Sequence, residues 1–425
     1  MRKYARISTL LLCLACACGT FVAARLIREP SVRAWFHPGF LSAWLRVGEA
    51  MRLANAHYVD ASAVTHGKLA EKALASVPSG LDAHSNYLPP AGYEQFQRQT
   101  EQVYVGIGIG WQMLEGVPVV LSVFPGSAAA EAGILPGDRI VGIDGVPPIA
   151  ASISAVNRRI MGVEGTKVSL EISREGQAAP FVRGVARRKT HMPTLSGKRM
   201  VNADTAYVRV DLFESRTAGE LAAALAELTG AGAKHLVLDL RDNPGGLVNA
   251  AVDTVGLFCP KGTLVATTES RDREAVVSYT TRAAPVAPGL PVAVLVNRES
   301  ASAAEIVSGA LQDLRRAIVV GDRTYGKGSV QTVYPLRAGA GLRITTARYL
   351  LPNGRSIHGG GVQPDVYQPI DPRERALLAL AGPWRELGRE HEFVRQYGWT
   401  PPQDTQLAAA VDVLRTLGSA RRKMP

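Results

Sequence analysis

The distribution of apolar residues changes twice along the chain. Up to about residue 98 they recur at helical spacing, as in 41–47 (LSAWLRV) and 68–74 (KLAEKAL). Beyond residue 104, short alternating segments are separated by Gly and Pro, and the runs 236–240 and 291–296 are nearly continuous apolar stretches typical of buried strands. Helical spacing returns at 407–414. This order predicts an α+β chain with helical regions at both ends.

Length and composition allow several domains. The chain has 425 residues, of which 46% are hydrophobic and 20% charged, and its length suggests about three domains. The predicted divisions are a signal peptide or anchor (1–24), a helical N-terminal region (25–98), two β-rich or mixed segments (99–188 and 189–370) and a helical C-terminal region (371–425). The net charge of +11 is scattered, so nucleic acid is not an expected partner.

The first residues suggest export. Arg2, Lys3 and Arg6 precede an apolar run from 7 to about 24, which is the layout of a secretory signal and is also barely long enough for an uncleaved anchor. We therefore expect an exported protein, either periplasmic or membrane-anchored and facing the periplasm. Whether the segment is cleaved, lipidated at one of its cysteines or retained is left open. We expect no disulfide framework and no metal, because only Cys259 lies outside this segment and no Cys/His cluster has ligand spacing.

Two residues suggest nucleophilic chemistry. Ser302 follows the apolar run 291–296 and opens an alanine-rich helical segment, so it is expected where a strand turns into a helix. Lys327 lies in a glycine turn. A serine hydroxyl needs a base within hydrogen-bond reach, and a desolvated lysine can act as one. Taken alone, such a serine is more often a helix cap and such a lysine a solvated turn residue. Glu305, one turn after Ser302, is interpreted as a helix-start charge.

The turn after 236–240 contains the pair Gly245 and Gly246, which allows backbone N–H groups to approach a ligand oxygen. A purely conformational turn is the alternative. A phosphate-binding loop around Lys327 is excluded, because that motif needs Ser or Thr directly after the lysine and the chain has Gly328.

The segment from 104 to 145 resembles a PDZ domain. It contains the run 104–110 (YVGIGIG), then 125–134 (PGSAAAEAGI) and 136–138 (PGD) in the order found in such domains. The resemblance implies a small β-sandwich that captures a terminal carboxylate on the N–H groups of a glycine-bearing loop and pairs the peptide with the next strand edge. The implied peptide-binding residues are Gly106, Ile107, Gly108 and Ile109. A small β-rich domain without a ligand is the alternative.

The sequence around Ser302 and Lys327 resembles that of the carboxy-terminal processing (tail-specific) proteases, which carry an inserted PDZ domain. The matching segments are 300–303 (SASA) and 324–328 (TYGKG), and the lysine follows the serine by 25 residues. The resemblance implies a nucleophile at Ser302, a base at Lys327 and an orienting amide at Gln331. It further implies that the N–H groups of Gly245, to within one residue, and of Ala303 form the oxyanion hole.

This resemblance covers residues 68 to 366 and implies an α/β peptidase core of crotonase/Clp-like type. Ala83 stands where the family has a proline, which affects one loop and not the dyad. The implied function is an exported serine endopeptidase that recognises protein C-termini through its PDZ domain, cleaves near them and needs no cofactor. Its partners would be protein substrates with accessible C-termini, and an activating adaptor and a homo-oligomer both stay open.

Two other classes of function would explain part of the sequence. A catalytically inactive PDZ adaptor would keep the peptide groove but have lost the dyad, whereas Ser302, Lys327 and Gln331 are all present. An acyl-CoA enzyme of crotonase type would share the core fold but leaves the PDZ-like segment unexplained.

Overall fold

The computed structural model describes residues 37–100, 104–114, 116–124, 126–148, 152–190, 193–272, 276–386, 388 and 390–422. The predicted signal or anchor therefore lies outside the described residues. No helix within those ranges is long and apolar enough to cross a membrane. The chain forms two compact units: one holds the described residues up to Pro90 together with Pro335–Arg343, and the other holds the remainder.

The smaller unit is mainly helical. Its elements are α3 (Pro38–His57), the 3-10 turn η1 (Ala61–Ala63), α4 (His66–Ser79), β1 (Asn86–Leu88) and the 3-10 turn η2 (Arg337–Gly339). The side chain of Thr65 caps α4 by accepting the N–H of Lys68. β1 pairs antiparallel with the first residues of β17 (Gly341–Leu350), Leu88 lying opposite Gly341. The N-terminal region therefore contains a strand in addition to its helices. The sequence did not indicate this strand, because three residues are too few to show an alternating pattern.

The PDZ-like segment begins after α5 (Pro90–Thr100) and folds around one antiparallel sheet. Its strands run in the order β3-β4-β5-β6-β7, beside a separate β2–β8 pair. A compact core of isoleucines and valines lies beneath this sheet, including the fully buried Ile140 and Val168. The elements are β2 (Tyr104–Gly106), β3 (Ile109–Leu114), β4 (Val117–Val123), α6 (Ala128–Glu131), β5 (Arg139–Ile143), α7 (Ile153–Ile160), β6 (Lys167–Ser173), β7 (Phe181–Ala186) and β8 (Arg188–Thr190).

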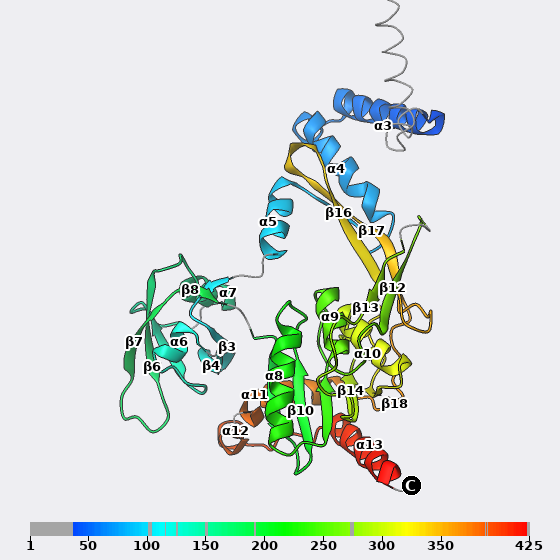
Figure 1. Cartoon of the computed structure of the whole chain (residues 1–425). Helices are drawn as coiled ribbons and strands as arrows, with labels where there is room; N and C mark the ends of the chain where they lie inside the picture. Colours follow the sequence, from blue (N-terminus) through cyan, green and yellow to red (C-terminus); the bar gives the residue numbers. More distant parts are fainter. Residues whose placement is uncertain are drawn as a thin grey trace, which may run out of the picture. The chain divides into compact units, whose positions relative to one another are not determined.

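A second, largely parallel sheet has the order β18-β15-β14-β11-β10-β9, and only β9 is antiparallel to its neighbour (Figure 1). Helices α8, α9 and α10 contribute to the core on one side of it, and α13 to the core on the other. The elements are β9 (Leu195–Met200), β10 (Thr205–Val210), α8 (Thr217–Gly230), β11 (His235–Asp239), α9 (Val248–Gly256), β14 (Val292–Val296), α10 (Ala303–Asp313), β15 (Ala317–Gly321), β18 (Val366–Tyr367) and α13 (Thr405–Arg422).

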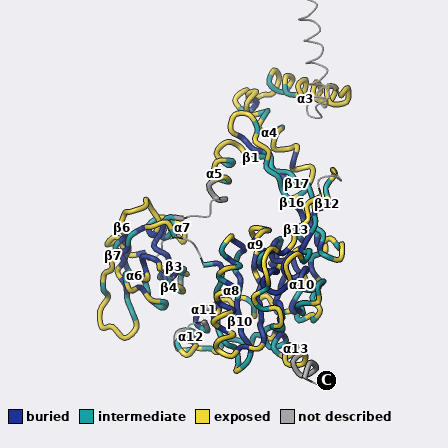
Figure 2. Tube along the Cα trace, viewed as in Figure 1, coloured by how far each residue is buried: buried dark blue, intermediate teal, exposed yellow. Residues whose placement is uncertain are grey.

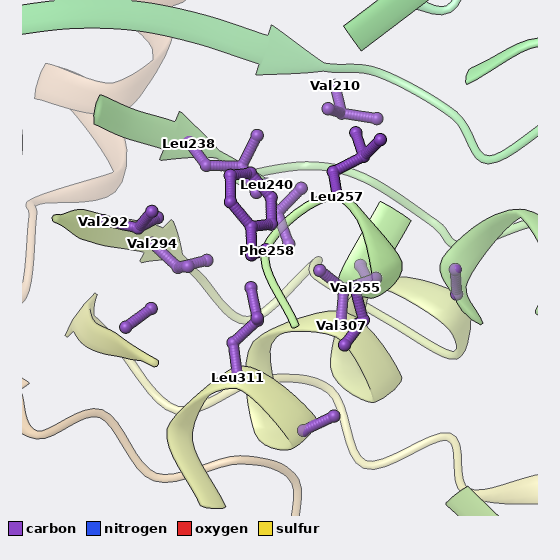
Figure 3. Packing of buried hydrophobic residues seen from close by; sticks show 14 of the residues in the cluster. Val210, Leu238, Leu240, Val255, Leu257, Phe258, Val292, Val294, Val307 and Leu311 are labelled. Carbon is purple, nitrogen blue, oxygen red and sulfur yellow. The ribbon is translucent and has the colours of Figure 1, made fainter. Parts of the chain in front are cut away.

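Both faces of this sheet are buried, which explains the continuous apolar runs in the sequence. Figure 2 shows the central strands in the colour of buried residues. Leu238 and Val294 point to the helix α10 side, where Figure 3 shows them beside the Phe258 ring and Leu311. Their neighbours in sequence point to the opposite face, toward Leu414 and its neighbours on α13. Strands covered on both faces need apolar residues at every position, so their sequence does not alternate.

The remaining elements form a smaller sheet and the C-terminal helices. β17 pairs with β12 and with β16, and β12 pairs with β13. The predicted α+β class with a helical N-terminal region, a PDZ domain and a mixed peptidase-type core is confirmed. The elements are β12 (Leu264–Ser270), β13 (Ser278–Thr280), β16 (Ser329–Pro335), α11 (Pro372–Glu386) and α12 (Glu390–Tyr397).

Candidate active site

Three loops converge at one edge of the parallel sheet. β11, β14 and β15 are neighbours and run parallel, so their carboxyl ends meet at the same edge. The loops that follow them contain Gly245, Ser302 and Lys327 respectively. The sheet therefore brings together the three segments that the sequence analysis singled out, although they are up to 82 residues apart in the chain.

Ser302 occupies a sharp turn between β14 and α10. Its backbone has φ 55° and ψ −115°, a left-handed conformation that a residue with a side chain adopts only when the surroundings enforce it. Two contacts hold this turn against the loop after β11: the Ala301 N–H donates to the Asn243 carbonyl at 2.9 Å, and Ser300 Oγ donates to the Leu240 carbonyl at 2.7 Å. Ala303 is the first residue of α10, and its N–H donates to no acceptor in the part of the chain that the structure describes.

Glu305 connects the serine turn to the lysine turn. Its side chain is fully buried, and one carboxylate oxygen accepts the N–H of Ser302 at 2.9 Å and the N–H of Lys327 at 2.8 Å. The other oxygen accepts the Thr324 hydroxyl at 2.5 Å and the Gly326 N–H at 2.7 Å. A carboxylate satisfied by four donors is a rigid link, and it fixes the backbones of Ser302 and Lys327 on either side of a single oxygen. The interpretation of Glu305 as a helix-start charge missed this role.

The Lys327 side chain is half-buried, and its Nζ makes no hydrogen bond or ion pair with any described residue. Among the described residues, no hydrogen bond joins Lys327 Nζ to Ser302 Oγ; catalytic hydrogen bonds of this kind can tighten only when the substrate binds. Gln331 lies on β16, where its Nε2 donates to Ser329 Oγ at 2.8 Å and more weakly to Thr345 Oγ1 at 3.4 Å. The structure therefore places Gln331 on the strand that leaves the lysine turn, and no hydrogen bond joins the two side chains in the described part of the chain.

Gly245 lies directly against Ser302, and Gly246 lies against the Phe213 backbone. A Cβ added to Gly245 would come within 2.7 Å of Ser302 Cβ and 2.9 Å of the Ala303 nitrogen. The Gly245 N–H, however, donates to Asn243 Oδ1 at 2.8 Å. Gly246, at φ 132°, is the member of the pair whose N–H has no acceptor among the described residues. The oxyanion role of Gly245, to within one residue, and of Ala303 stays a prediction; in this conformation the Asn243 side chain occupies the Gly245 amide and leaves that of Gly246 without an acceptor among the described residues.

A buried ionic group lies at the start of the same loop. Asp239, at the end of β11, accepts hydrogen bonds from the Arg241 guanidinium at 2.6 to 3.0 Å and from the Tyr207 hydroxyl at 2.7 Å. Burial by itself would raise the pKa of Asp239, but the charges of Arg241 and Arg209 outweigh it and hold that pKa at about 2. Burial and the neighbouring Asp239 charge raise the pKa of Tyr207. Near neutral pH, Asp239 and Arg241 are therefore ionised, whereas the Tyr207 hydroxyl keeps its proton.

The PDZ-like groove has an open strand edge. β3 pairs with β4 on one side and has no partner on the other among the described strands. Just before it, the carbonyl of Ile107 accepts the Ala129 N–H and the carbonyl of Gly108 accepts the Phe124 N–H, whereas the N–H groups of both residues are without an acceptor in the described ranges. Ile109 then begins β3. The four predicted positions from Gly106 to Ile109 are therefore contiguous with a free edge, and two of them offer free N–H donors.

Gly108 is required by its surroundings. Its φ is 83°, and an added Cβ would lie 2.2 Å from Ser127 Cβ. No group of three or more His, Cys, Asp or Glu side chains that could hold a metal ion occurs within the described ranges.

Comparison with known proteins agrees with this geometry. Residues 204–368 match the model of peptidase family S41, and residues 119–174 match a PDZ domain model. A carboxy-terminal-processing protease of Bartonella bacilliformis is 35% identical over 321 residues, which cover 74% of this chain and 73% of that protein. A carboxyl-terminal-processing protease of Synechocystis is 35% identical, and the matched region covers 69% of this chain and 64% of that protein. The chain therefore spans less than two thirds of the Synechocystis relative.

Among solved structures, a putative S41 protease from Bacteroides fragilis has a TM-score of 0.50 at 18% identity, covering 75% of this chain and 87% of that one, which shows a shared fold. The photosystem II D1 C-terminal processing protease is 28% identical with a TM-score of 0.46, covering 76% of this chain and 92% of that one. The identity and coverage of the Bartonella relative, together with the two domain matches, carry the conclusion. The chain belongs to the carboxy-terminal processing proteases of peptidase family S41 and is a serine-type peptidase with a PDZ domain.

Proposed function

We propose that this peptidase cleaves exported proteins near their C-termini with Ser302 as nucleophile and Lys327 as general base. The observation that carries the assignment is the buried Glu305 carboxylate, which holds the backbones of both residues on one oxygen atom. A serine that only caps a helix and a lysine in a solvated turn would not need to be held by the same buried carboxylate. The strained φ of Ser302 at a strand-to-helix turn is a second support, because such strain is concentrated at functional sites.

In the proposed reaction, Lys327 Nζ acts as the base and takes the proton of Ser302 Oγ as that oxygen attacks the scissile carbonyl carbon. The carbonyl oxygen becomes an oxyanion next to the free N–H groups of Ala303 and Gly246. Collapse of this intermediate breaks the C–N bond, and Lys327 returns the proton to the leaving amine. Water then attacks the acyl-enzyme by the same route. Each oxyanion donor would contribute about 2.7–4 kcal/mol to lowering the barrier.

We further propose that the PDZ domain selects substrates by their terminal carboxylate. The free N–H groups of Ile107 and Gly108 are suitable donors for a carboxylate, and the open edge of β3 is suitable for main-chain pairing with the residues before it. Export is proposed from the basic and apolar pattern of residues 2–24 alone. It would be tested by fractionating cells that express the full-length chain, and retention of the whole protein in the cytoplasm would refute it.

The catalytic assignment is tested with Ser302→Ala and Lys327→Ala in the full chain. Each should abolish shortening of a protein with a free C-terminus, followed by mass spectrometry, while circular dichroism stays that of the wild type. The exposed residues Ser278 and Lys261 provide matched controls, and their alanine variants should cleave normally. If Lys327→Ala cleaves at a near-normal rate, the proposed base is wrong. A wild-type chain that binds C-terminal peptides but never cleaves them would indicate the inactive adaptor instead.

Carboxylate recognition is tested in the Ser302→Ala variant of the full chain, so that binding is measured without cleavage. An apolar peptide with a free carboxy terminus should bind at least about tenfold more tightly than the same peptide with an amidated terminus, because charged hydrogen bonds of about 1.5–3 kcal/mol would be lost. Equal affinities in a calorimetric titration would refute carboxylate capture.

A further inference from the structure

The C-terminal helix α13 begins next to the loop that contains the glycine pair. Asp404 is the residue directly before α13, and its carboxylate forms a bidentate pair with Arg241: Oδ1 accepts from Nη1 at 3.0 Å, and Oδ2 accepts from Nη2 at 2.8 Å. Gln406, which is fully buried, adds a third acceptor through Oε1 at 3.1 Å from Nη1. These contacts join residues more than 160 positions apart in the chain.

The Arg241 guanidinium is fully occupied by this arrangement. Its Nε donates to Asp239, Nη1 donates to Asp404 and Gln406, and Nη2 donates to both Asp239 and Asp404. The carboxylates of Asp239 and Asp404 are both at most 10% exposed. A planar guanidinium held bidentately by a second carboxylate has a defined position and orientation, which one partner alone would leave less constrained.

Arg241 is also the second residue of the loop that continues from β11 to Gly246. Two residues after it, the Asn243 carbonyl accepts the Ala301 N–H from the serine turn, and Asn243 Oδ1 accepts the Gly245 N–H. A shift of Arg241 would therefore be passed directly to the glycine pair and to the residue preceding Ser302. Other contacts hold the loop as well, since Asn243 Nδ2 donates to the Val210 carbonyl at 2.7 Å and the Asp242 N–H donates to Asn297 Oδ1 at 2.9 Å, so Arg241 sets the loop position together with them.

We propose that Asp404, assisted by Gln406, is a positioning residue for the oxyanion donors and acts through Arg241. The C-terminal region is then more than a cover for the sheet, because its helix start sets the position of the loop that carries Gly246. The proposal rests on the proposed catalytic roles of Ser302 and the glycine pair. The alternative is that Asp404 only caps α13, since its Oδ1 also accepts the Leu407 N–H at 2.9 Å.

Asp404→Asn separates the two roles. Asparagine caps helices as well as aspartate does, and its Oδ1 can still accept from Leu407 and from Arg241 Nη1. Its amide group, however, replaces Oδ2 and brings N–H donors against the Nη2 donors of Arg241. The matched control is Asp412→Asn, which removes the same charge from the same helix at a side chain that is 75% exposed.

The readout is binding of a peptide boronic acid to the full chain, because its tetrahedral adduct with a serine places an oxygen where the oxyanion would lie. Loss of an oxyanion donor costs about 10²–10³ in kcat, and displacing one should cost less, so we expect Asp404→Asn to weaken boronate binding and kcat by about tenfold. Affinity for an uncleaved peptide, measured with Ser302→Ala added, should stay within about twofold, as should every property of Asp412→Asn.

The proposal is overturned if boronate affinity and kcat of Asp404→Asn stay near the wild-type values, or if boronate and ground-state peptide affinities fall by the same factor. If Asp404→Asn does not fold, Gln406→Leu is the deciding variant, because it keeps the helix cap and the carboxylates of Asp239 and Asp404. It should weaken boronate binding and kcat by less than Asp404→Asn and leave peptide affinity unchanged. An unchanged Gln406→Leu would then overturn the proposal. Failure of the proposed catalytic roles is recognised separately, since the wild type would then bind the boronate no better than Ser302→Ala.

Discussion

Replacing Glu305 by glutamine should damage both the stability and the activity of this peptidase, although the change is nearly isosteric. The carboxylate accepts four hydrogen bonds and donates none. An amide has one accepting oxygen, so it can serve either the pair of Ser302 and Lys327 or the pair of Thr324 and Gly326, but not both.

The cost can be worked out from the contacts. If the amide oxygen faces Ser302 and Lys327, two charge-assisted hydrogen bonds become neutral ones, each weaker by about 1 kcal/mol. The Gly326 N–H then faces the amide N–H₂ and stays unsatisfied in a buried place, which costs about 1–3 kcal/mol. Burying a neutral amide is cheaper than burying a carboxylate, which offsets part of the loss. We expect a net loss of about 3 kcal/mol from the free energy of unfolding, a large share of the 5–15 kcal/mol typical of proteins.

The loss of activity should exceed what unfolding explains. If the two backbones move by about 1 Å relative to each other, kcat should fall about 100-fold even where the variant is folded. The assay pairs urea unfolding with single-turnover acylation at a temperature at which circular dichroism shows a folded chain. Glu227→Gln is the control, because Glu227 lies exposed on α8 in an ion pair with Lys198 and should change neither measurement. A Glu305→Gln variant with kcat within threefold and stability within about 0.5 kcal/mol of the wild type would refute the reasoning.

Three further expectations concern pH, the backbone and the general base. The pKa of Asp239 lies near 2 rather than at its ordinary 3.8, so its ionised form stabilises the fold by about 2 kcal/mol above pH 4. This stabilisation is lost as the pH falls toward 2. In urea unfolding from pH 6 to 2.5, the free energy of unfolding should therefore fall less in Asp239→Asn than in the wild type. Gly246→Ala should not fold stably, because its Cβ would lie 2.1 Å from the Phe213 carbonyl oxygen, whereas Gly219→Ala, on open helix surface, should gain about 0.5–1 kcal/mol; equal thermal midpoints would contradict this. Lys327→Arg should fail to acylate, because a guanidinium cannot take the proton of Ser302; a variant that still acylates in a single-turnover assay would exclude Lys327 as the base.

The sequence alone was sufficient for the central strands and the place of the serine. The apolar runs 236–240 and 291–296 correspond to β11 and β14, because strands buried on both faces need apolar residues at nearly every position. Ser302 was expected at a strand-to-helix junction, and it lies between β14 and α10. The sequence also singled out Gly108 as a peptide-binding position, but its φ of 83°, which disfavours a side chain, was seen only in the structure.

Only the tertiary structure decided how the site is held together. From the sequence, Glu305 is one more acidic residue in a first helical turn, because nothing local shows that donors from a distant loop will surround it. The choice between Gly245 and Gly246 likewise depends on the Asn243 side chain, which the fold directs onto one amide. Asp404 reaches Arg241 only because α13 packs across the sheet. Local pattern fixes which segments become strands and turns, whereas hydrogen bonds between segments far apart in the chain exist only once the parallel sheet has placed their loops at one edge.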